Sequence, residues 1–218
     1  MKPKLISTRL CPYAQRCEIV LHQKDIPHEI EYVDLNNPPS WFQEVSPLKK
    51  VPALVVGETA FFGSSVINEY LDEQYPNRLH PHGTLAKATS RSWIEFGGEC
   101  ITDIGGMMLQ RTEADALAAR DALLSKFDRL ERVVGADPLF SGTQFSLVDA
   151  AYAPAFQRLD YLDAVWPGCW DPRRHPNIAA WKNRLLAHPS VVRSTVLGLR
   201  DLFYDFIRRR EGYVTRFL

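Results

Sequence analysis

The order of strand-like and helix-like segments in the first 76 residues constrains the fold of this chain more than any other feature. The β-like runs are Lys4–Thr8, His28–Val33, Val51–Val56 and Thr59–Phe62, and helical patterns follow Cys11, Ser40 and Ser64. Their order, β-α-β-α-β-β-α, predicts an α/β domain over residues 1–76. Gly57-Glu58 is the expected hairpin turn between the last two strands.

The rest of the chain predicts a different architecture. Residues 77–83 are rich in turn formers and read as a linker, and from Thr84 onward the pattern is helical almost to the end. The expected helices are 84–111, 113–134, 146–161, 177–187 and 191–210, with soft points or a kink expected at Gly97-Gly98 and Gly105-Gly106. Ser146 and Asp149 have the spacing of a capping box. An all-helical C-terminal domain over residues 84–218 is therefore expected.

Cys11 stands where the first strand ends and the first helix begins. Pro12 fits the first helical position, because proline has no N–H to leave unpaired there. The first N–H groups of that helix then face the sulfur and favour a thiolate, so we expect Cys11 to titrate well below pH 8.5. The alternative is a small buried hydrophobe, which is the common role of an isolated cysteine.

The other cysteines make this a monothiol site. Ala14 occupies the position of the second cysteine in a Cys-x-x-Cys motif, so Cys11 needs an outside thiol to resolve a mixed disulfide. Cys17, Cys100 and Cys169 are scattered without disulfide or zinc spacing. The residues before the first strand have no apolar run of the kind that a secretory leader contains, so we expect no leader and a cytoplasmic protein.

Charge and hydropathy exclude several classes of function. The formal net charge is zero, which argues against binding nucleic acid over the whole surface, and no apolar run is long enough for a membrane span. No cluster of cysteine and histidine has metal-ligand spacing. His80-Pro81-His82 is interpreted as part of the linker rather than as a metal site, so no metal is expected.

Five motifs together carry a family resemblance that covers both predicted domains. They are Cys-Pro-Tyr-Ala-x-Arg at 11–16, Trp41-Phe42, Val51-Pro52-Ala53-Leu54, Ser64 followed by Val66-Ile67, and Phe145-Ser-Leu-Val-Asp149. In this order they resemble a cysteine-type cytosolic glutathione transferase, nearest the omega class and related bacterial enzymes. The resemblance implies a thioredoxin-like N-terminal domain, an all-helical C-terminal domain, a homodimer and a cis bond before Pro52.

The resemblance also implies the roles of individual residues. Cys11 would be the catalytic residue that faces or bonds the glutathione sulfur, with Tyr13 beside it. Leu35 and Val51 would contact the cysteinyl part of glutathione. The main chain of Val51, just before cis Pro52, would pair with this part of glutathione as an added strand does. Ser64 would hold the γ-glutamyl carboxylate at a helix N-terminus.

Two positions depart from the family pattern. Gly63 stands where the family usually has the glutamate that meets the γ-glutamyl ammonium, and Pro38 falls where omega members carry a lysine near the glycyl carboxylate. Lys50 resembles a lysine that other classes use just before Val-Pro, and it is the expected substitute. Losing one charge-assisted contact costs about 1.5–3 kcal/mol.

The second substrate is expected against the first long helix. Trp93, Phe96 and Cys100 have 3–4 spacing on that helix, which in this family walls the second-substrate pocket, although such a stripe is also typical of core. Ser64 also has a structural interpretation. Either Ser64 or Ser65 is expected to cap the helix that follows, and a serine does so whether or not it binds a ligand.

Two functions remain open at this stage. The first is a glutathione-dependent thiol transferase or reductase that acts on a small hydrophobic or disulfide substrate, with glutathione as co-substrate and a mixed disulfide at Cys11. The second is a non-enzymatic scaffold or regulatory protein with a weakened glutathione site, which Gly63 and Pro38 favour. Cys11-Pro12 favours the enzyme, because a scaffold has no need for a thiol at a helix N-terminus.

Overall fold

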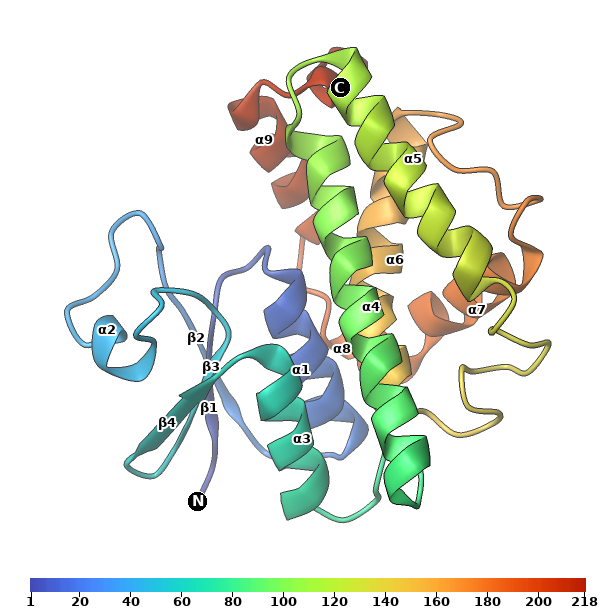
Figure 1. The fold of residues 1–218 in the computed structure, drawn as a ribbon. Helices are drawn as coiled ribbons and strands as arrows, with labels where there is room; N and C mark the ends of the chain where they lie inside the picture. The colour runs from blue at the N-terminus through green and yellow to red at the C-terminus, as the bar shows by residue number, and fades with distance from the viewer.

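A four-stranded sheet forms the N-terminal part of the protein (Figure 1), and the computed structural model describes all of residues 1–218. The strands are β1 (Lys4–Ser7), β2 (Glu29–Tyr32), β3 (Ala53–Val56) and β4 (Thr59–Phe62), in the spatial order β2-β1-β3-β4. β1 is parallel to β2 and antiparallel to β3, and β3 and β4 form a hairpin. The predicted α/β domain is confirmed.

Three helices complete this part of the protein, and the alternation of strand residues separates the two faces of the sheet. The helices are α1 (Pro12–Gln23), α2 (Phe42–Val45) and α3 (Ser64–Gln74). Leu5 and Leu54 point into the large core shared with α1 and α3. Their neighbours Ile6 and Ala53 point to the opposite face and pack with Phe42 of α2.

The remainder of the chain is helical, as expected. It contains α4 (Thr84–Leu109), α5 (Glu113–Leu130), α6 (Leu147–Val165), α7 (Pro176–Ala187), α8 (Pro189–Arg193), α9 (Leu199–Arg210) and the 3₁₀ helix η1 (Tyr213–Phe217). α4 packs on α5 and α6, and α6 packs on α1 (Figure 1). One cluster of 42 buried residues runs from Leu5 to Val214, so the sheet and the helical part share a single core.

Two predicted features of the helical part differ in the structure. The helix expected over 191–210 is divided, because Gly198 has a φ of +72° and begins α9 as its N-cap. α4 continues through both glycine pairs. Gly97 instead allows close packing, since a Cβ there would lie 2.9 Å from Cε2 of Tyr152 on α6.

Asp149 holds the start of α6 in the capping box that the sequence predicts. The Ser146 hydroxyl accepts the N–H of Asp149, and the carboxylate accepts the N–H of Ser146 at 2.8 Å. The same carboxylate accepts the indole N–H of Trp181 at 2.7 Å and the N–H of Phe140 at 3.0 Å. This fully buried group therefore joins α6, α7 and the loop before α6.

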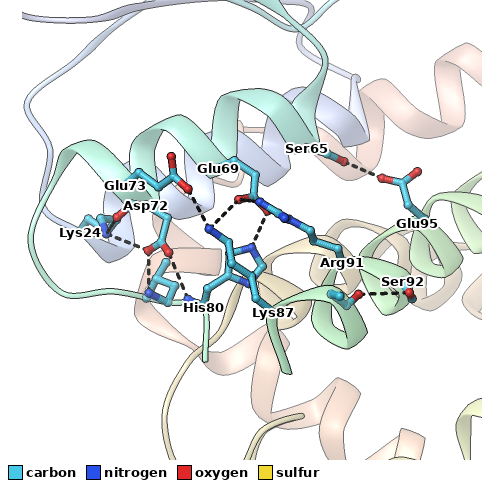
Figure 2. Close-up of polar contacts among 12 residues, drawn as sticks. Lys24, Ser65, Glu69, Asp72, Glu73, His80, Lys87, Arg91, Ser92 and Glu95 are labelled. Carbon is cyan, nitrogen blue, oxygen red and sulfur yellow. Dashed lines mark hydrogen bonds and ion pairs between the residues drawn. The ribbon is translucent and has the colours of Figure 1, made fainter. Parts of the chain in front are cut away.

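The segment between α3 and α4 is anchored by a buried ion pair (Figure 2). Lys24 Nζ lies 3.0 Å from Asp72 Oδ1, and their side chains are 0% and 1% exposed. Lys24 also donates to the Asn77 carbonyl at 3.0 Å. The Asp72 carboxylate accepts the N–H groups of Leu79 and His80 at 2.6 and 3.2 Å. These contacts fix the path of the chain from α3 to α4, although the domain limits at 77–83 stay a prediction.

Candidate functional site

Cys11 caps the first helix with its own sulfur. It is the N-cap of α1, and its Sγ accepts the N–H of Ala14 at 3.3 Å. Its own N–H donates to Thr8, which closes the turn between β1 and α1. On the opposite side, Sγ lies 3.7 Å from the Val51 carbonyl oxygen. The strand-turn-helix junction thus holds the sulfur between a helix N-terminus and the segment before β3.

Burial changes the expected acidity of this thiol. Cys11 keeps part of its surface exposed, but most of the volume around the sulfur is protein, and this burial raises the pKa of the thiol. The N–H groups of Ala14 and Tyr13 and the charge of Arg158 act in the opposite direction and only partly offset the burial. The prediction of a lowered pKa is therefore wrong, because desolvation of the thiolate outweighs the helix N-terminus.

The main chain of Val51 makes no hydrogen bond to another main-chain group, and its carbonyl accepts only the Cys11 thiol. The Val51–Pro52 bond is cis, as the resemblance implies. The next strand, β3, begins only at Ala53. An extended peptide can therefore add beside this segment, close to the Cys11 sulfur.

Gly63, not a serine, caps α3. Gly63 is the N-cap with a φ of +91°, and Ser64 is the first helical residue, which corrects the prediction that Ser64 or Ser65 fills the cap. The Ser64 side chain is nearly buried and its hydroxyl has no hydrogen-bond partner within the protein. An unpaired hydroxyl beside the first N–H groups of a helix suits a carboxylate ligand.

Six of the seven residues predicted to bind glutathione surround one cavity of about 420 Å³. They are Tyr13, Lys50, Val51, Pro52, Gly63 and Ser64. Tyr13 also reaches the helical part, since its hydroxyl donates to the Gly98 carbonyl at 3.3 Å. Leu35 does not line this cavity; it is an exposed residue of the loop after β2.

A second, smaller cavity of about 110 Å³ lies between Pro12 of α1 and the helices α4, α6 and α9. Ile101, Ile104, Gly105 and Met108 form its α4 wall. Trp93, Phe96 and Cys100, which the sequence predicts at a second-substrate pocket, do not line this cavity, and their role stays a prediction. Trp93 packs against Phe96 and Phe140, and Cys100 is fully buried.

Arg158 of α6 is a site residue that the sequence does not suggest by any motif. Its guanidinium lines the smaller cavity and donates to the Leu10 carbonyl at 3.2 Å, just before Cys11. It also donates to Gln15 of α1. Burial lowers the pKa of Arg158 to about 10, so it stays charged at neutral pH. The only sequence signal is its place two residues after an almost wholly apolar run from Leu147 to Phe156.

Glu18 shares this electrostatic environment. It lies on α1 two turns after Cys11, and burial raises its pKa to about 7 against the opposing charge of Arg158. Its charge in turn raises the pKa of Cys11. Glu18 is therefore ionised only in part at neutral pH, which limits its effect on the thiol.

No three or more His, Cys, Asp or Glu side chains come together in a way that could hold a metal ion. None of the helices combines the length and the apolar character that crossing a membrane requires.

Comparisons with known proteins agree on one family. Residues 5–79 match the family model for the glutathione S-transferase N-terminal domain, and residues 92–184 match that for the C-terminal domain. Glutathione S-transferase omega-1 of Sus scrofa is 30% identical over 192 residues, which are 86% of this chain and 78% of the relative. Pyrimidodiazepine synthase of Drosophila melanogaster is 32% identical over 198 residues, which are 87% of this chain and 79% of that relative.

A solved structure extends the similarity to the whole fold. The crystal structure of glutathione transferase Omega 3C from Trametes versicolor has a TM-score of 0.81 and 25% sequence identity. The similarity covers 89% of each chain. The thioredoxin-like sheet and the helical part are therefore arranged together as in that protein.

Proposed function

The chain belongs to the glutathione S-transferase family, and from this premise we propose that it is an omega-like thiol transferase in which Cys11 forms a mixed disulfide with glutathione. The observation that carries the proposal is the position of the Cys11 sulfur, 3.7 Å from the Val51 carbonyl, beside the 420 Å³ cavity that ends at α3. The fold agrees with this family throughout.

The proposed pose of glutathione follows the free groups around that cavity. Its γ-glutamyl carboxylate binds the Ser64 hydroxyl and the first N–H groups of α3. Its cysteinyl unit pairs with the main chain of Val51. This places the glutathione sulfur beside Cys11. Lys50, which lines the same cavity, is the proposed partner of the glycyl carboxylate, because Pro38 removes the lysine that omega members use.

The reaction is two thiol–disulfide exchanges. The Cys11 thiolate attacks the glutathionyl sulfur of a mixed disulfide substrate, so the Cys11–glutathione bond forms and the substrate thiolate leaves and takes up a proton. A glutathione thiolate then attacks this intermediate, which releases oxidised glutathione and restores Cys11. Cys17 does not serve as a resolving thiol, because it is fully buried against the carbonyls of Tyr13 and Ser64.

Positioning contributes more than acidity in this proposal. Because burial raises the pKa of Cys11, the attacking thiolate is a minor species at neutral pH. The fixed approach of the two sulfur atoms compensates for that small fraction. Arg158 and the N–H of Ala14 stabilise the thiolate once it forms.

The smaller cavity is the proposed second-substrate site. Its walls are mostly apolar, and Arg158 supplies one buried charge, which also binds the Leu10 carbonyl just before Cys11. Burial raises the pKa of Cys11, and the charge of Arg158 is close enough to act in the opposite direction. The apolar walls fit a small apolar or aromatic group carrying a disulfide, thioether or carbonyl. The relative named pyrimidodiazepine synthase gives a precedent for a small heterocyclic product within the family. A cytoplasmic homodimer completes the proposal.

The test is glutathione-dependent reduction of a low-molecular-weight mixed disulfide, followed as oxidised glutathione is formed. The wild type is expected to turn over with a rate that rises with pH, and Cys11→Ser is expected to be inactive. Cys169→Ser is the matched control, because Cys169 is buried near Asp163, away from the site. Equal rates for wild type and Cys11→Ser would refute the assignment.

A scaffold function is the second candidate, and Gly63 and Pro38 are the observations that favour it. A protein that binds partners rather than glutathione has no need for acidic and basic residues at these positions. Direct titration with glutathione separates the two, since a scaffold with a lost site shows no binding heat.

A further inference from the structure

A small polar recess separates the N-terminus of α3 from α4. Arg16, Ser64, Ser65, Asn68 and Glu95 are among the residues that line it, and its volume is about 20 Å³. That volume suits one group about the size of a water molecule, which is also the size of an ammonium group. Ser64 and Ser65 line both this recess and the larger cavity, so the two adjoin.

Two polar atoms in the walls have no partner within the protein. They are Nη2 of Arg16 and Oδ1 of Asn68, on side chains whose residues are 3% and 6% exposed. A buried donor or acceptor without a partner destabilises the fold unless a ligand or water satisfies it. One is a cationic donor and the other is an acceptor, so the recess matches a ligand that offers both an anion and an N–H group.

The carboxylates near the recess are not equivalent, as Figure 2 shows. Glu69 is held by Arg91 at 2.6 Å and by His80 Nε2, and it also lies 3.4 Å from Lys87. Glu95 forms no ion pair. Its only polar contact is the Ser65 hydroxyl, which donates to its Oε1 at 3.1 Å. Glu95 is exposed to solvent. Burial lowers the pKa of Arg16, which also lines the recess, and Arg16 is the one buried cation near enough for the Glu95 charge to oppose that shift. The Glu95 carboxylate therefore keeps free acceptor positions beside the start of α3.

Gly63 leaves a gap at this same place. Glycine has no side chain here, whereas the family usually carries a glutamate that meets the γ-glutamyl ammonium. Glu95 of α4 approaches the same place, because its carboxylate accepts the hydroxyl of Ser65, two residues after Gly63. A carboxylate from the helical part thus reaches the end of the cavity where the amino-acid end of glutathione is proposed to bind.

We propose that Glu95 is the acidic partner of the γ-glutamyl ammonium of glutathione and replaces the missing side chain at Gly63. The ammonium enters the recess and donates to Glu95 and to Oδ1 of Asn68. The carboxylate of the same γ-glutamyl unit of glutathione binds Ser64 and the N-terminus of α3, on the side of Arg16. The inference rests on the proposed function, because it requires that glutathione binds at this site.

The test compares two ligands that differ only in that ammonium group. S-methylglutathione and its analogue built on glutaric acid, which lacks the amino group, are titrated by calorimetry into the wild type and Glu95→Gln. The S-methyl group prevents disulfide formation at Cys11, so binding alone is measured. Glu99→Gln is the matched control, since Glu99 is exposed one turn further along α4 and makes no hydrogen bond to α3.

The expected result is specific to one ligand. Glu95→Gln weakens binding of S-methylglutathione about tenfold, as for a lost charge-assisted hydrogen bond, and leaves binding of the glutaric analogue unchanged. Glu99→Gln binds both ligands as the wild type does. Equal affinity of the wild type and Glu95→Gln for S-methylglutathione would overturn the inference and leave the proposed function standing.

Two other outcomes also count against Glu95. An equal loss for both ligands would mean that Glu95 only positions Ser65, which contradicts a contact with the ammonium. A wild type that binds neither ligand would remove both the inference and the proposed function.

Discussion

Replacing Lys24 by methionine tests the buried ion pair that anchors the chain between α3 and α4. Lys24 Nζ donates to Asp72 Oδ1, to the Asp72 carbonyl and to the Asn77 carbonyl, at 3.0, 3.3 and 3.0 Å. Methionine keeps most of the apolar stem and removes all three contacts. The Asp72 carboxylate then keeps only two backbone N–H partners in a site without water contact.

The expected cost follows from this burial. Removing one partner of a buried ion pair typically costs about 3–5 kcal/mol, because the other charge stays buried and uncompensated. The N–H groups of Leu79 and His80 still stabilise Asp72, so we expect Lys24→Met to lower the free energy of unfolding by about 3 kcal/mol, the lower end of that range.

Urea denaturation followed by tryptophan fluorescence measures this change, with a second lysine as the control. Lys87 pairs with Glu73 at 2.8 Å in the same region (Figure 2), but these side chains are 22% and 60% exposed. Exposed pairs contribute up to about 1 kcal/mol, so Lys87→Met is expected to have a small effect. A Lys24→Met loss no larger than that of Lys87→Met would refute the reasoning.

Two further substitutions test the electrostatics and the backbone of the site. Glu18→Gln is expected to stabilise the fold by up to about 3 kcal/mol at pH 8 and by nearly nothing at pH 4. The reason is that burial raises the pKa of Glu18 to about 7, so the wild type loses stability as the pH rises from about 4.5 to 7. A difference in urea denaturation that does not change with pH would contradict this. Gly63→Ala is expected to cost about 1–2 kcal/mol from its φ of +91° alone, since the nearest atom to a new Cβ, on Val66, lies 3.9 Å away. An unchanged unfolding midpoint would show that this backbone is not strained.

Local sequence patterns predicted the elements that depend on neighbouring residues. Pro12 after Cys11 and Ser146 before Asp149 mark helix starts that the structure contains, because cap geometry is decided within a few residues. The cap at Gly63 and the break at Gly198 were missed, although both are local. In each case a glycine with positive φ replaces the expected serine cap or interrupts an otherwise helical pattern.

The parts of the site that the sequence did not predict depend on contacts between distant segments. Which face of α4 lines the smaller cavity depends on how α4 packs against α6, where Gly97 meets Tyr152. Arg158 reaches Leu10 from 148 residues away, and Glu95 reaches Ser65 across 30. The acidity of Cys11 was mispredicted for the same reason, because the burial that raises its pKa comes from the assembled fold.

A mixed disulfide at Cys11 is tested most directly by the intact mass of the protein after incubation with oxidised glutathione. We expect the wild type to gain one glutathionyl group that reduced glutathione removes, and Cys11→Ser to gain none. A wild type that gains no adduct, or an adduct that persists in Cys11→Ser, would contradict a mixed disulfide at Cys11.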